Sequence, residues 1–234
     1  SRSLFIMNLL KIVRSPFRYV FFNATFFVIG FNLLVFLLTN MMRSLGNYLA
    51  LNVILIHEYK MYWQFFTYMF VHGDFSHLFF NMLGLFFFGL AVEQSLGSKE
   101  FLLIYFISGI FCGIASYLFY LFTGAYYVFL VGASGAINSL LLAYAVIFPR
   151  NRIYLMGILP IPAPLLVAIY AGIEIASQLL TLRNGIAHMT HLAGFAFAWL
   201  YFMIRMGILL QCLQKFYTNQ KRMDKHGNLL TNLS

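Results

Sequence analysis

Two residues in this 234-residue chain carry side chains that could form an activated nucleophile. Ser134 lies among small residues, with Gly132 and Gly135 beside it, and His191 lies in a separate apolar stretch. A histidine next to a serine can accept the hydroxyl proton and later return it to a leaving group. Polar and ionisable side chains are costly in lipid, so their default interpretation is functional. The pair predicts acyl transfer if folding brings the two side chains together.

Each member of this pair also has a structural interpretation. Ser134 could be a plain helix N-cap, with glycines beside it that serve helix packing. The elbow G-x-S-x-G of soluble hydrolases does not match, because residue 136 is alanine. His188, one turn before His191, is interpreted as interfacial or structural. The two histidines could be a metal pair, but their i, i+3 spacing without a nearby carboxylate or cysteine argues against it, and we expect no metal and no cofactor.

Other polar residues could stabilise the oxyanion of acyl transfer. His77 and Asn81 are spaced i, i+4, on one face of a predicted helix, and the backbone N–H of Ser134 is unpaired where its helix begins. The alternative for His77 and Asn81 is hydrogen bonding that holds a helix bundle together. Glu174 is interpreted as a packing residue. With no carboxylate as a third member, the expected scheme is a Ser–His dyad.

The composition places the chain in a membrane. Hydrophobic residues make up 62% and charged residues 9%, against roughly half and a quarter in soluble domains. Long apolar runs without strand-like alternation favour helices over a barrel. The net charge of +9 does not indicate a nucleic-acid partner, because the basic residues flank the apolar runs, as in membrane topology signals.

We expect an all-α membrane protein, a bundle of six transmembrane helices in one domain over residues 1–234. The predicted spans are 19–39, 77–94, 101–123, 134–148, 162–180 and 187–206, followed by a basic tail over about 207–234. Twelve of the fifteen Lys and Arg residues fall in segments on the side of the N-terminus. This asymmetry predicts that both termini are cytoplasmic.

The fourth span is short. Its fifteen residues rise about 22 Å, whereas the hydrocarbon core is about 30 Å thick. Arg150 and Arg152 fix its inner end at the cytoplasmic surface, so Ser134 lies below the outer surface. Irregular backbone at that depth requires protein or a water-filled cavity around it. We therefore expect a submerged, wet pocket with Ser134 at its floor.

Stripes of small residues give Ser134 a route to His191. His191, Gly194 and Ala198 share one helical face, and Gly135 and Ser139 share a face of the short span. Small residues allow membrane helices to approach closely. If these two helix faces pack against each other, His191 rather than His188 lies next to Ser134.

Several motifs in this order resemble the rhomboid family of intramembrane serine proteases, over roughly Trp63 to Arg205. They are the segment 66–77, His77-x-x-x-Asn81, Glu93 with Leu96-Gly97, Gly132-Ala133-Ser134-Gly135, and the stretch Ala187 to Gly194. We identify the minimal six-span prokaryotic type, because no seventh span or soluble domain is visible.

The resemblance implies roles for particular residues. Ser134 would be the nucleophile and His191 the base, and His77, Asn81 and the Ser134 backbone would form the oxyanion site. Gly132 and Gly135 would support that site. His72, otherwise interpreted as a solvated loop residue, would help to hold water in the cavity.

The resemblance also implies what the protein acts on and where. The implied activity is cleavage of transmembrane segments of single-span or multi-span membrane proteins, near their outer ends. The implied location is a bacterial inner membrane, with the lipid bilayer as a further partner. The alternative is a catalytically inactive rhomboid-like protein that binds transmembrane segments.

Three positions depart from the family pattern. Gln64 follows Trp63 where many members have arginine, and Ala198 takes the place of a glycine. Asn138 stands four residues after Ser134, where many bacterial members have an aromatic ring that stacks on the histidine. The packing of His191 therefore has to come from elsewhere.

Overall fold

The computed structural model describes residues 17–155, 158–180 and 186–207, and most of them are helical. Residues 17–199 belong to one compact unit, and 200–207 belong to a second, in which the last helix ends. The elements in chain order are α2 (Ala24–Met41), α3 (Arg43–Leu49), α4 (Val53–His57), α5 (Gln64–Thr67), the 3-10 helix η1 (Tyr68–Phe70), α6 (Phe75–Gly84), the π-helix η2 (Leu85–Gly89), α7 (Leu90–Leu96), α8 (Ser98–Thr123), α9 (Ser134–Ile147), β1 (Arg152–Leu155), β2 (Leu159–Pro162), α10 (Ala163–Leu180) and α11 (Ile186–Ile204).

Among the described residues, three helical segments are long and apolar enough to cross a membrane. They are Ala24–Met41, Phe75–Leu96 and Ser98–Thr123, with mean hydropathies of 1.9, 1.8 and 2.1. Each of the other predicted spans also holds a helix, and α9 has 14 residues. The count of six spans and the single-domain division stay predictions. The predicted basic tail lies outside the described residues after Gly207.

The first long helix begins later than the sequence predicts, at Ala24 rather than near residue 19. Asn23 has a left-handed backbone (φ 59°), which interrupts helical geometry. The buried Glu93 carboxylate then accepts hydrogen bonds from the backbone N–H groups of Ala24 and Thr25, at 2.6 and 2.9 Å. Since the first N–H groups of a helix lack partners within it, Glu93 caps α2 from α7.

The connector between α2 and α6 folds into short helices around a buried amide. The Gln64 side chain accepts from the backbone N–H of Asn52 at 3.1 Å and donates to the carbonyl of Tyr48 at 3.1 Å. Gln64 is fully buried, and Asn52 donates in turn to the carbonyls of Tyr126 and Val128. Gln64 thus holds the first connector together, and Asn52 joins it to the connector that precedes α9.

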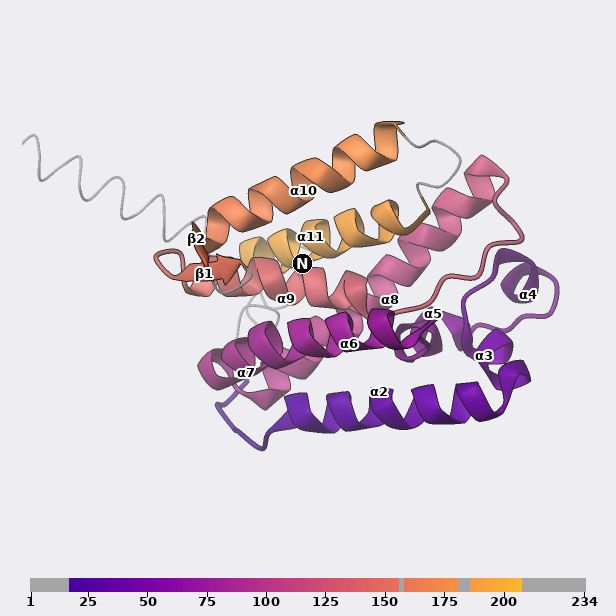
Figure 1. Ribbon diagram of the computed structural model, residues 1–234, viewed down its shortest axis with the longest axis horizontal. Helices are drawn as coiled ribbons and strands as arrows, with labels where there is room; N and C mark the ends of the chain where they lie inside the picture. Colours follow the sequence, from indigo (N-terminus) through magenta and orange to yellow (C-terminus); the bar gives the residue numbers. More distant parts are fainter. Residues whose placement is uncertain (1–16, 156–157, 181–185, 208–234) are drawn as a thin grey trace, which may run out of the picture. The chain divides into compact units, whose positions relative to one another are not determined.

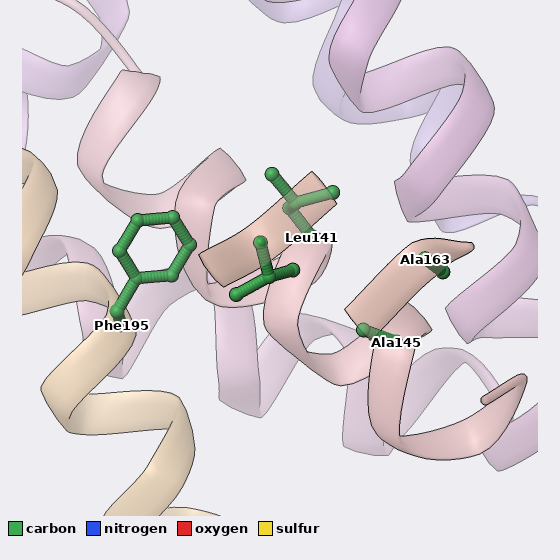
Figure 2. Close-up of a cluster of buried hydrophobic side chains, with 5 residues drawn as sticks. Leu141, Ala145, Ala163 and Phe195 are labelled. Atoms are coloured by element: carbon green, nitrogen blue, oxygen red, sulfur yellow. The ribbon is translucent and has the colours of Figure 1, made fainter. Parts of the chain in front are cut away.

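The helix α9 is surrounded by other helices. Figure 1 shows it with α6 on one side and α10 and α11 on the other, and it also packs on α8. An apolar cluster joins α9, α10 and α11; Figure 2 shows Leu141 and Ala145 of α9 gathered with Ala163 of α10 and Phe195 of α11. This packing holds α10 and α11 against the second half of α9.

The connector before α10 contains a hairpin that the sequence analysis did not predict. Strands β1 and β2 pair antiparallel, with Arg152 opposite Pro162 and Leu155 opposite Leu159. Pro160 and Pro162 lack a backbone N–H, so this segment does not have the usual sequence pattern of a strand. The fold is therefore mostly helical with one small two-stranded sheet.

Candidate active site

Ser134 is placed at the start of α9 by a turn that requires glycine. Gly132 has φ 109°, which L side chains rarely adopt, and its N–H donates to the carbonyl of Tyr68 at 3.0 Å. A Cβ atom at Gly132 would lie 2.6 Å from Nε2 of His77. Gly132 thus serves both the backbone turn and the close approach of His77.

His191 reaches Ser134 across a tight contact of α9 with α11. A Cβ atom on Gly194 would lie 2.1 Å from the carbonyl oxygen of Gly135, and Ser139 Oγ donates to the carbonyl of Gly194 at 2.7 Å. The predicted small-residue stripes therefore face each other. Where α9 begins, His191 Nε2 lies 2.7 Å from Ser134 Oγ.

A carboxylate completes this arrangement, contrary to the interpretation of Glu174 as a packing residue. Glu174 of α10 places one oxygen 2.8 Å from Nδ1 of His191 and the other 2.5 Å from Nδ1 of His188. An ionised carboxylate only accepts hydrogen bonds, so these contacts put a proton on Nδ1 of each ring. Nε2 of neutral His191 then presents its lone pair to the Ser134 hydroxyl.

An aromatic ring that the sequence analysis missed lies beside His191. The Tyr170 ring of α10 is 6.4 Å from the His191 ring, with the planes 31° apart. The Tyr170 side chain also interacts with Glu174 and with Asn138. Tyr170 thus supplies from α10 the ring that Asn138 cannot supply from α9.

His77 and Asn81 face the loop that leads into α9. Both project from α6 toward Gly132, and a Cβ atom there would lie 3.8 Å from Asn81 Nδ2. Asn81 Nδ2 donates to the carbonyl of His77 at 2.9 Å, which leaves the second amide N–H for another acceptor. The structure brings both side chains to the same cavity as Ser134 and His191.

His72 is buried rather than solvated, which corrects its interpretation as a loop residue in water. His72 is 4% exposed, and its ring lies edge-on to the His77 ring with the ring centres 5.2 Å apart. Nδ1 lies 3.3 Å from the carbonyl of Phe70, and Nε2 has no hydrogen-bond partner among the described residues. Burial lowers the pKa of His72 to about 4, so the ring is neutral at physiological pH.

The cavity in front of Ser134 has a volume of about 500 Å³, within the range of ligand pockets. Apolar side chains, among them several from α6, α9 and α10, form most of its wall, and polar side chains also line it. The polar ones are His77, Asn81, Ser134, Asn138, Tyr170, Thr190 and His191. The arrangement can hold an apolar chain segment and place one of its carbonyl groups beside a serine.

Comparison with known proteins indicates the same family as the sequence motifs. The Rhomboid domain family model matches residues 59–208. RHOMBOID-like protein 12, mitochondrial, of Arabidopsis thaliana is 31% identical over 149 residues, 56% of this chain and 43% of that protein. Rhomboid protease GluP of Bacillus subtilis (strain 168) is 41% identical over 91 residues, 39% of this chain and 17% of that protein. The chain thus aligns with less than half the length of either relative.

The long apolar helices and the matched domain define an integral membrane protein. The family model covers well over half of the chain, and the chain belongs to the rhomboid family. The resemblance inferred from the sequence motifs is therefore confirmed.

Proposed function

We propose that this protein is an intramembrane serine endopeptidase, with Ser134 as nucleophile and His191 as general base and acid. The 2.7 Å contact of Ser134 Oγ with His191 Nε2, inside a cavity of a rhomboid-family protein, carries the proposal. His191 takes the serine proton as Oγ attacks a substrate carbonyl carbon, and then gives it to the leaving amine. Water, activated by the same histidine, releases the acyl group and restores Ser134.

The developing oxyanion needs donors in front of Ser134. The backbone N–H of Ser134 and the side chains of His77 and Asn81 are the groups proposed for this role. Gly132 leaves room for His77 and Asn81, and Gly135 supports the site by letting α9 pack closely against Cys112 and Thr190. His72, neutral and buried behind His77, supports the orientation of that ring. Glu174 is proposed as a positioning residue, because it holds the tautomer of His191 that can act as a base.

The substrates proposed are transmembrane segments of single-span or multi-span membrane proteins, cut near their outer ends. The apolar wall of the cavity suits such segments, which must unwind locally to expose a carbonyl. Weak helix formers near the cleaved bond should help this unwinding. The excess of basic residues on the side of the termini supports a cytoplasmic location of both termini, in a bacterial inner membrane.

A fluorophosphonate probe tests the proposed chemistry directly, because it forms a covalent bond with an activated serine. We expect labelling of the protein in liposomes, with the adduct located on Ser134 by peptide mass spectrometry. Labelling should be lost in His191→Ala and kept in His57→Ala, whose histidine is exposed on α4. Absence of an adduct on Ser134 in the wild-type chain would favour the alternative, a rhomboid-like protein that binds transmembrane segments without cleaving them.

A further inference from the structure

Three potential metal ligands meet beside the site. One ring nitrogen of His188, one of His191 and a carboxylate oxygen of Glu174 all lie within 4.8 Å of one another, and in both rings Nδ1 is the nitrogen that contacts Glu174. The histidines come from the first turns of α11 and the carboxylate from α10. Without a carboxylate, the i, i+3 histidine pair is a weak metal site. The fold supplies that carboxylate from α10.

Two histidines and one glutamate form a donor set that zinc uses with water as the fourth ligand. Imidazole and carboxylate together suit zinc and neighbouring first-row metals better than magnesium or calcium. We propose that this cluster of Glu174, His188 and His191 binds a divalent transition-metal ion such as Zn²⁺, and that the bound ion switches off the peptidase. The inhibitory part rests on the proposed function, whereas the binding part does not.

The ion would occupy the space between the histidine Nδ1 atoms and the carboxylate. Zinc bonds of about 2.0–2.2 Å place tetrahedral ligand atoms roughly 3.3 Å apart. His188 Nδ1 now lies 2.5 Å from one Glu174 oxygen and His191 Nδ1 lies 2.8 Å from the other, so each of these distances has to lengthen by less than about 1 Å. The ion replaces the two Nδ1 protons, which in the neutral rings move to Nε2.

This change of tautomer accounts for the inhibition. A neutral imidazole has one N–H and one lone pair. While Glu174 accepts from Nδ1, the lone pair of His191 is on Nε2 and faces Ser134. When a metal ion takes the lone pair of Nδ1, Nε2 carries the proton and donates to Ser134 Oγ. It can no longer accept the serine proton, although the nucleophile itself is untouched.

An ion can reach the cluster past His188. The His188 side chain is 28% exposed, whereas those of His191 and Glu174 are 16% and 5% exposed. Nδ1 of His188 points to Glu174, whereas the hydrogen bond to Ser134 Oγ comes from His191. His188 is therefore the ligand whose removal separates metal binding from catalysis most cleanly.

The binding experiment uses the full chain carrying Ser134→Ala, so that it does not depend on cleavage. Titration with Zn²⁺ by calorimetry, and with Co²⁺ followed by its visible absorption, should show one ion per chain. Adding His188→Ala should weaken binding at least about 10-fold, because loss of a mere outer-shell partner of a ligand already costs about 10-fold or more. His57→Ala, which removes an exposed histidine on α4, should bind as before. Absence of binding, or equal binding without His188, would overturn the site.

The activity experiment uses the wild-type chain in liposomes with a single-span substrate. Zn²⁺ should reduce cleavage, and a chelator should restore it. Cleavage by each protein is expressed relative to its own zinc-free rate. The Zn²⁺ concentration for half inhibition should be at least about 10-fold higher for His188→Ala than for the wild type. If Zn²⁺ binds to the Ser134→Ala chain but does not inhibit the wild type, the metal site stands and only the tautomer argument is contradicted. Absence of zinc-free cleavage in the wild type would instead contradict the proposed function.

Discussion

Glu174 Oε1 lies 2.8 Å from Nδ1 of His191, on the opposite side of the ring from Ser134. A buried carboxylate in an apolar helix therefore orients the histidine that faces the serine. The arrangement has three linked side chains, where the sequence indicated two. Glu174 also divides its two oxygens between His191 and His188, so one carboxylate fixes both rings.

The first prediction concerns this carboxylate. Glu174→Gln keeps the shape of the side chain but can offer N–H to Nδ1, which favours the wrong tautomer of His191. We expect kcat to fall by about 10²- to 10⁴-fold, in line with loss of an orienting carboxylate in serine hydrolases. KM should change less than about two-fold. A change confined to KM, with kcat preserved, would contradict the positioning role.

The second prediction concerns the ring of Tyr170. Tyr170→Phe keeps the ring beside His191, whereas Tyr170→Leu removes it. An aromatic pair contributes about 0.5–1.5 kcal/mol beyond burial, so we expect Tyr170→Leu to lower kcat/KM by about 2- to 10-fold. Tyr170→Phe should stay closer to the wild type. Equal losses in both variants would assign the effect to the hydroxyl group near Glu174 instead.

The third prediction tests the contact between α9 and α11. Gly194→Ala places a Cβ atom 2.1 Å from a backbone oxygen, which cannot move aside as a side chain could. We expect destabilisation of about 1–3 kcal/mol, measured as a lower melting temperature in detergent, with loss of activity. Gly172→Ala on α10 is the matched control, because nothing lies within 4 Å of its Cβ position. Equal melting temperatures for the two variants would show that the contact between α9 and α11 does not contribute to stability.

The fourth prediction concerns pH. The backbone N–H of His77 donates to Asp74 at 2.8 Å and holds the pKa of that carboxyl below its usual value. Because the folded pKa is the lower one, this cap stabilises the protein above the unfolded pKa of about 3.9. The stabilisation is lost as pH falls through the folded pKa.

Asp74→Asn separates this effect from the other carboxylates. Asparagine also caps helices but does not titrate. We expect the melting temperature of the wild type to fall more steeply than that of Asp74→Asn as pH decreases below about 4. Parallel curves for the two proteins would show that Asp74 does not contribute through its charge.

The sequence allowed prediction of the parts that depend on local pattern. The helix ranges follow from apolar runs, and the encounter of Ser134 with His191 follows from small residues on two faces. Gly132 and Gly194 occupy positions where the structure leaves no room for a side chain.

Contacts between distant segments could not be predicted in the same way. The cap of α2 by Glu93 spans about 70 residues of sequence, so the late start at Ala24 has no local signal. The pairing of Glu174 with the His191 ring depends on how α10 packs beside α11, and the sequence analysis missed it. A single charge within an apolar helix was the available signal, because such residues default to a functional role.

The most direct test of the account is cleavage of a single-span substrate by the purified chain in liposomes. We expect cleavage by the wild type and by His57→Ala, and substantial cleavage by His188→Ala. Ser134→Ala and His191→Ala should each lose at least about 10³-fold in rate, with melting temperatures close to that of the wild type. Cleavage at the wild-type rate by either of these two variants would contradict the central claim that Ser134 and His191 perform the reaction.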